Sequence, residues 1–168
     1  MKKIFVPLLI LLAGIVVSTA QTKTERPENY RDVGALLPPM RVIDTFGTEH
    51  REDEFKNGHP FFMVLFNPTC GHCIDMGRLI GSNIEAFDSC KVLFLAGVQM
   101  MPYLNTYYQA TGLVNHPQIV VGIDSAQTVD RLFNYKPLPQ INIYDEESKL
   151  VKIFYGGVAI DSLRQYVR

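Results

Sequence analysis

The fold is decided by one stretch of the chain, Phe61-Phe62-Met63-Val64-Leu65-Phe66-Asn67-Pro68-Thr69-Cys70-Gly71-His72-Cys73. Its first six residues are apolar without a break, and such a run predicts a strand that is covered on both faces. Asn67-Pro68-Thr69 ends the strand, and Asn67 or Thr69 is suited to cap a helix predicted from Ile74 to Phe87. The two cysteines therefore lie where a buried strand gives way to a helix.

Two thiols with two residues between them at such a junction are placed for a reversible disulfide. The start of a helix presents unpaired backbone N–H groups and the positive end of the helix dipole, and both stabilise a thiolate. The thiolate is the form of cysteine that attacks a disulfide. A permanent bridge between Cys70 and Cys73 is the alternative, but so short a loop restrains the unfolded chain little. The motif therefore indicates thiol–disulfide exchange.

The N-terminus has the pattern of a secretory signal peptide over residues 1–20. Lys2 and Lys3 are followed by an apolar stretch from Ile4 to Val17 and by the small-residue exit Ser18-Thr19-Ala20. We expect cleavage after Ala20 and a periplasmic or otherwise extracytoplasmic protein. The apolar stretch is short for a membrane span, which needs about 20 residues, but an uncleaved anchor is the alternative.

After residue 20 the sequence predicts a flexible lead-in over residues 21–36 and one domain over 37–168. The formal net charge of the whole chain is −1, and no basic run suggests nucleic acid as a partner. We expect a monomer that needs no cofactor.

The chain has three cysteines, so pairing Cys70 with Cys73 leaves Cys90 over. Cys90 is interpreted as a small buried residue beside a strand, with a third redox thiol or an intermolecular link as the alternative. A zinc site is disfavoured, since one CxxC pair provides two of the four ligands that structural zinc takes. The histidines His50, His59 and His116 have no metal-like spacing to the cysteines.

The rest of the chain alternates strands and helices. Residues 41–44 are predicted as an edge strand, followed by a turn at Phe46-Gly47-Thr48. Further predicted strands cover residues 92–98, 119–123, 141–144 and 149–155, and predicted helices cover 103–112, 125–135 and a closing segment with Ile160, Leu163 and Val167. This alternation predicts an α/β fold, a central mixed sheet with helices on both faces.

Taken together these features resemble the thioredoxin fold, and within it the exported TlpA/ResA-like redoxins. The resemblance covers residues 37–168 and depends on the strand and turn over 39–47, the strand–CxxC junction, Leu138-Pro139 before a strand, and the final hairpin with its glycine over 145–157. It implies that Cys70 attacks and that Cys73 resolves the mixed disulfide. It also implies a cis peptide bond at Pro139, with the backbone of Leu138 offered to substrate.

The family resemblance also bears on redox potential and partners. A protonated His72 near Cys70 favours the thiolate and makes the disulfide more oxidising. Cys-Gly-His-Cys resembles the centre of protein disulfide isomerase, so we expect a potential between that of thioredoxin, about −270 mV, and that of the isomerase, about −180 mV. The implied partners are exported proteins that contain cysteines, and a membrane-bound or soluble electron donor.

The chain departs from the thioredoxin pattern at two places. Val64 stands where thioredoxin has a buried aspartate, and Thr69 stands where a tryptophan usually precedes the first cysteine. The proton acceptor for Cys73 is therefore open, with Asp75 and Glu85 as candidates that are otherwise solvated helix residues. A set of side chains is interpreted as core, with an apolar rim for unfolded substrate as the alternative; it comprises Met76, Met100, Met101, Tyr103, Tyr107 and Tyr108.

Exchange of the Cys70–Cys73 disulfide with cysteines of exported proteins is the leading interpretation, with the direction of electron flow left open. A peroxiredoxin-like thiol peroxidase is one alternative, although the Pro68-Thr69-Cys70 spacing is shorter than in that family. A non-catalytic thioredoxin-like binding module is the other, favoured by the missing aspartate and tryptophan.

Overall fold

A computed structural model describes residues 29–87, 89–133 and 137–167 of the chain. The predicted signal peptide and the uncleaved anchor that is its alternative lie outside the described residues. Within these ranges no helix combines the length and the apolar character needed to cross a bilayer.

A seven-stranded mixed sheet forms the centre of the molecule, in the order β2-β1-β5-β4-β3-β6-β7. Neighbours β3, β4 and β5 are parallel, and the outer pairs are antiparallel. The strands are β1 (Arg41–Asp44), β2 (Glu49–Arg51), β3 (Phe61–Leu65), β4 (Lys91–Gly97), β5 (Ile119–Asp124), β6 (Gln140–Tyr144) and β7 (Leu150–Tyr155). The strand that leads to the cysteines, β3, therefore lies inside the sheet between β4 and β6.

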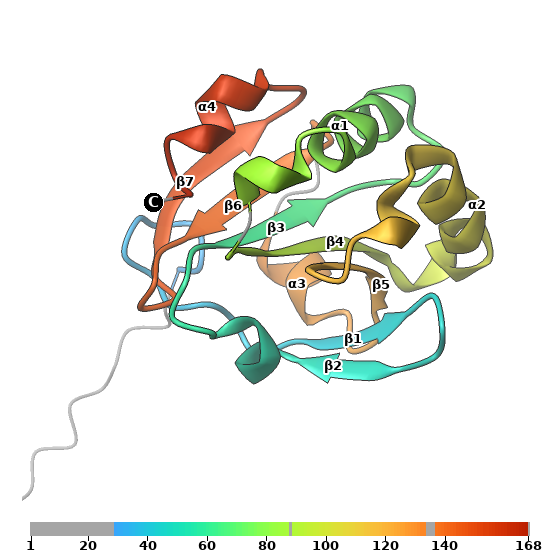
Figure 1. Ribbon diagram of the computed structural model, residues 1–168. Coiled ribbons are helices and arrows are strands. Elements are labelled where there is room, and N and C mark those ends of the chain that lie inside the picture. Colours follow the sequence, from blue (N-terminus) through green and yellow to red (C-terminus); the bar gives the residue numbers. More distant parts are fainter. Residues whose placement is uncertain (1–28, 88, 134–136, 168) are drawn as a thin grey trace, which may run out of the picture.

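Helices cover both faces of this sheet, as the sequence predicts (Figure 1). One face carries α1 (Gly71–Gly81), α2 (Met101–Thr111) and α4 (Ile160–Arg164), and the other carries α3 (Thr128–Leu132) together with a short 3₁₀ turn over Glu52–Phe55. Further 3₁₀ turns cover Ile84–Phe87, Val98–Met100 and Leu113–Asn115.

The unbroken apolar run is a fully buried strand, as expected. Every residue of β3 is buried because alternate side chains point into two different cores. Phe62 and Val64 pack with α1 and α2, whereas Phe61 packs on the opposite face with Phe55 and Tyr144. This double cover holds the strand end that carries the CxxC loop in a fixed place.

Three of the predicted elements are wrong in extent. The helix predicted from residue 74 to 87 begins earlier, at Gly71, and ends at Gly81, and a separate 3₁₀ turn follows it. The helix predicted over 125–135 begins only at Thr128, because Gln127 adopts a left-handed conformation (φ 53°), and α3 ends at Leu132, where Phe133 is extended. Residues 134 and 135 lie outside the described residues. The helix predicted over 103–112 begins two residues sooner, with Pro102 in its first turn, where a missing N–H costs little.

The strand over residues 41–44 is β1, but the prediction that it forms a sheet edge is wrong. The edge is β2, which pairs with β1 through Val42 and His50, and β1 lies between β2 and β5. The polar triplet Glu49-His50-Arg51 gives no apolar alternation that would predict a strand.

A glycine allows β1 to join the sheet closely. A Cβ atom on Gly122 of β5 would lie 2.5 Å from Cγ1 of Val42 and 2.7 Å from the carbonyl oxygen of Ile43. Separations below 3 Å force atoms to move, and here one of the neighbours is backbone. Gly122 is therefore required where β1 and β5 meet.

Gly122→Ala should destabilise the fold by about 1 to 3 kcal/mol, since it overpacks a tight strand contact. The free energy of unfolding from urea or guanidinium titration measures this. Gly157→Ala is the matched control, because a Cβ there has open space around it, and it should change stability by less than about 0.5 kcal/mol. Equal stability of the two variants would contradict the close packing of β1 on β5.

Candidate redox site

The two cysteines lie at the start of α1, with one sulfur far more accessible than the other. Cys70 is the N-cap residue of α1 and is half-buried, whereas Cys73 is 1% exposed. The backbone N–H groups of Cys73 and Ile74 donate to the Cys70 carbonyl at 3.1 and 3.0 Å. Both thiols are free, so this is the dithiol form of the pair.

The loop before the cysteines is held by Asn67. Its side-chain oxygen accepts hydrogen bonds from the backbone N–H of Thr69 at 2.9 Å and from the Thr69 hydroxyl at 2.8 Å, and its carbonyl accepts from the backbone N–H of Cys70 at 3.0 Å. The expected cap of α1 by Asn67 or Thr69 is wrong, since no side chain caps that helix. Asn67 instead organises the turn that delivers Cys70.

The surroundings of Cys73 keep it protonated. Burial raises the pKa of the Cys73 thiol to about 12, and the adjacent Cys70 contributes to this rise. A hydrogen bond from the backbone N–H of Asn67 to the sulfur acts in the opposite direction and lowers the pKa. No carboxylate among the described residues contributes to this shift. Val64, at the position of the expected aspartate, is a fully buried apolar residue of the core. Cys73 is thus a thiol at neutral pH, and Cys70 is the more accessible of the two sulfurs.

Three aromatic rings pack together near the cysteines: Phe66 just after β3, Phe94 in β4 and Tyr107 in α2. The ring centroids of Phe66 and Tyr107 are 4.4 Å apart. The ring centroid of Phe94 lies 5.8 Å from that of Phe66 and 6.1 Å from that of Tyr107. The Tyr107 hydroxyl donates a hydrogen bond to the Cys73 carbonyl at 2.9 Å. From the sequence, Tyr107 is identified only as a core or rim candidate. The position of Tyr107 in the sequence does not predict this contact with α1.

The predicted cis peptide bond is present between Leu138 and Pro139. Because Leu65 pairs with Gln140, Pro139 lies opposite Phe66 at the end of β3. The Pro139 carbonyl accepts from Gly156 at 2.7 Å, whereas no bond between described residues occupies the backbone of Leu138. Leu138-Pro139 therefore lies beside the segment that leads into the CxxC motif.

Two shallow hollows flank this centre. One of about 210 Å³ is lined by His72, Asp75, Met76, Leu79, Gly157 and Val158. The other, of about 240 Å³, is lined by Phe66, Asn67, Gly97, Gln99, Met100, Asp130 and Leu138. Each is smaller than a typical small-molecule site, which is about 300 Å³ or more, and suits single side chains of a larger partner. His72 is exposed beside the first hollow, and its tuning role stays a prediction.

The two candidate proton acceptors and the third cysteine do not contribute to the pKa shift of Cys73. Asp75 and Glu85 are exposed, as solvated helix residues are, and Cys90 is 1% exposed within the core, where burial raises its pKa to about 11. Met76, Tyr107 and Tyr108 are buried, which confirms the core interpretation for them. The described residues contain no cluster of His, Cys, Asp and Glu fit for a metal ion.

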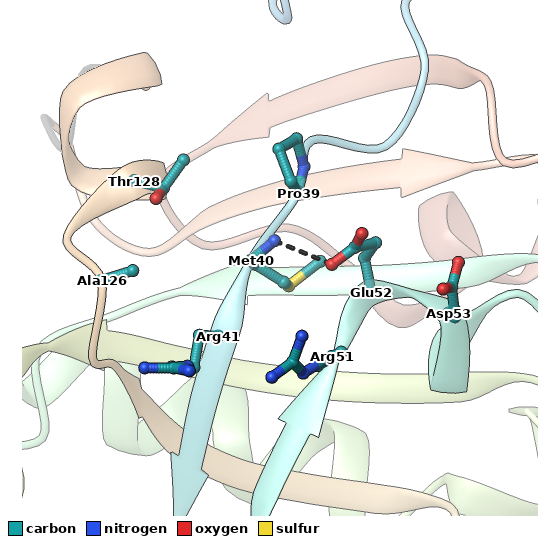
Figure 2. A pocket seen from close by; sticks show the side chains of 8 residues that line it. All are labelled: Pro39, Met40, Arg41, Arg51, Glu52, Asp53, Ala126 and Thr128. Carbon is teal, nitrogen blue, oxygen red and sulfur yellow. Dashed lines mark hydrogen bonds between the residues drawn. The ribbon is translucent and has the colours of Figure 1, made fainter.

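A larger hollow of about 300 Å³ lies over the β1–β2 hairpin and the start of α3 (Figure 2). Its cationic side chains are already paired, since Arg41 and Arg51 contact Glu49 at 3.2 and 3.1 Å. Its Glu52 accepts a hydrogen bond from the backbone N–H of Met40 at 3.1 Å, as Figure 2 shows. The hollow contains no nucleophile, and we assign it no chemistry.

Comparison with known proteins identifies the fold. The chain superposes on the thioredoxin domain of a thiol-disulfide oxidoreductase from Bacteroides vulgatus with a TM-score of 0.67 and 15% identity, covering 82% of this chain and 99% of that one. It superposes on StoA from Bacillus subtilis with a TM-score of 0.62 and 15% identity, covering 78% and 97%. It superposes on a secreted disulfide oxidoreductase of Mycobacterium tuberculosis with a TM-score of 0.63 and 12% identity, covering 76% of this chain and 92% of that one.

No family model and no curated protein sequence matches the chain. At these identities the structural likeness establishes the architecture alone. The chain has the thioredoxin fold, and its CxxC pair lies at the start of α1.

The unequal burial of the thiols predicts selective alkylation of the reduced protein. Iodoacetamide at neutral pH should modify Cys70, while Cys73 and Cys90 stay largely unmodified because both are buried and protonated. Mass spectrometry of peptides from the native protein measures the three rates. Labelling in denaturant is the control in which all three cysteines should react alike. Modification of Cys73 as fast as Cys70 in the native protein would contradict the described asymmetry.

Proposed function

We propose that this chain is an exported thiol–disulfide oxidoreductase that exchanges the Cys70–Cys73 disulfide with cysteines of other exported proteins. The observation that carries the proposal is the pair of unlike sulfurs on one helix turn: Cys70 is half-buried at the N-cap of α1, and Cys73 is 1% exposed behind it. A structural bridge needs no such difference. An exchange reaction does, because one sulfur must meet the partner and the other must act afterwards.

The reaction follows from this arrangement. The Cys70 thiolate attacks a disulfide of the client protein, and the Cys70–client bond forms as the client's own S–S bond breaks. Cys73 then loses its proton and attacks the Cys70 sulfur, which releases the second client sulfur as a thiol. Two electrons pass from the protein dithiol to the client disulfide, and the reverse sequence oxidises a client dithiol. With no carboxylate described at Cys73, its proton leaves to water or to the departing client thiolate.

The client would bind as an extended segment beside Leu138. The backbone of Leu138 makes no hydrogen bond with other described residues, so a client strand could pair with it as in strand addition. The hollows lined by His72 and by Gln99 would take side chains on either side of the client cysteine. Such binding depends on the client's backbone and on the shape of its side chains more than on one particular sequence. It therefore suits a protein that acts on several clients.

Export and an electron donor belong to the same proposal. The signal-peptide pattern of residues 1–20 supports export, and the Mycobacterium tuberculosis structural neighbour is described as secreted. A donor on or outside the membrane would return electrons to Cys70 and Cys73 if the protein acts as a reductant. No organic cofactor enters the exchange.

Substitution of each cysteine separates the two roles. Cys70→Ser should abolish reduction of insulin by dithiothreitol-regenerated protein, because no nucleophile reaches the client. Cys73→Ser should accumulate mixed disulfides between Cys70 and clients, seen on non-reducing gels of an extracytoplasmic extract. Cys90→Ser is the matched control and should keep normal activity. Cys90 directly precedes β4 at the end that pairs with Phe61, whereas Cys70 follows the opposite end of β3.

Intact activity of Cys70→Ser would refute the proposal. Rapid consumption of hydrogen peroxide through Cys70, without insulin reduction, would favour a thiol peroxidase. Inertness of the wild-type chain toward both substrates would favour the binding module, which the apolar Val64 supports.

A further inference from the structure

A tyrosine on α2 reaches the backbone of the resolving cysteine. Tyr107 is 2% exposed, and its hydroxyl donates to the Cys73 carbonyl at 2.9 Å across 34 positions of sequence. Cys73 is in the first turn of α1, so this bond joins α2 to the helix turn that carries the redox pair. Burial raises the pKa of the Tyr107 phenol, and the nearby Cys73 and Cys70 raise it further, so the phenol stays a hydrogen-bond donor.

A glycine opens the way for this hydroxyl. A Cβ atom on Gly77 would lie 2.5 Å from the Tyr107 hydroxyl oxygen and 3.1 Å from the ring carbon that bears it. Glycine weakens a helix interior, so its presence in α1 needs a packing reason. The reason here is room for the Tyr107 hydroxyl at the Cys73 carbonyl and for the Thr111 methyl carbon, which would lie 2.8 Å from that Cβ.

The same ring also contacts the loop on the other side of the cysteines. The Tyr107 ring packs on Phe66 with the ring centroids 4.4 Å apart. Phe66 directly precedes Asn67, whose backbone N–H donates to the Cys73 sulfur. Tyr107 therefore connects the carbonyl of Cys73 with the segment that contacts its sulfur.

We propose that Tyr107 is a positioning residue that holds Cys73 at the right place to attack the Cys70 sulfur, with Gly77 as its required partner. This inference rests on the proposed thiol exchange. It concerns the resolving step alone: the Cys73 thiolate bonds to the Cys70 sulfur, the Cys70–client bond breaks, and the client sulfur leaves with the electron pair and takes up a proton. The first attack by Cys70 does not need the Tyr107 bond.

Reaction of the reduced full chain with 5,5′-dithiobis(2-nitrobenzoate) separates the two steps. Attack by Cys70 releases one coloured thiolate in a second-order phase, and attack by Cys73 on the mixed disulfide releases another in a first-order phase. Tyr107→Phe keeps the ring and removes the hydroxyl. It should slow the first-order phase about fivefold or more, since small misplacements of reacting groups are costly, and leave the second-order phase unchanged.

Two further variants make the test specific. Gly77→Ala should slow the first-order phase to a similar degree, because its methyl group displaces the hydroxyl from the carbonyl. The double variant Tyr107→Phe with Gly77→Ala should be no slower than the slower single variant, as expected for two changes that break one contact. Tyr108→Phe, the neighbouring buried tyrosine, should leave both phases unchanged.

The outcomes are distinct. A normal first-order phase in Tyr107→Phe, or equal slowing of both phases, overturns the positioning role while the exchange function stands. A wild-type chain with no first-order phase overturns the exchange function and the role of Tyr107 with it.

Discussion

Burial of one sulfur immediately behind another is the constraint on which the site depends. Cys73 is 1% exposed and its pKa is raised to about 12, while Cys70 is half-buried at the helix start. A buried thiol is not accessible to a large partner, but it can react with a neighbouring sulfur one helix turn away. In the proposed exchange, this difference in burial sets the order in which the two sulfurs act.

The fold supplies this burial from both sides of the sheet. The strand β3 is covered completely, so the loop after it leaves the sheet at a fixed point. Above it, α1 packs closely on α2 because Gly77 and Gly81 face Tyr107 and Thr111 with no side chain of their own. Pro139 stands opposite Phe66 and completes the surroundings of the thiols. Each of these contacts holds Cys73 inside while Cys70 remains at the surface.

Much of this arrangement could be predicted from local patterns. The apolar run before Cys70 predicts β3, and the alternation of elements predicts the sheet. The cis bond at Leu138-Pro139 is implied by the resemblance to thioredoxin-fold redoxins. What could not be predicted depends on contacts between distant segments. The polar strand β2 forms because β1 offers it a free edge, and the bond from Tyr107 to Cys73 depends on how two helices pack. Neither has a signature in a short window of sequence.

Equilibration of the pure protein with glutathione buffers of defined potential shows whether Cys70 and Cys73 form a reversible disulfide. The fraction of the Cys70–Cys73 disulfide is followed by mass after thiol trapping. We expect a reversible two-electron transition between about −270 and about −180 mV, a range equivalent to about 4 kcal/mol. A bridge that never forms or never opens across that range would contradict it, and would leave a thioredoxin fold without exchange chemistry.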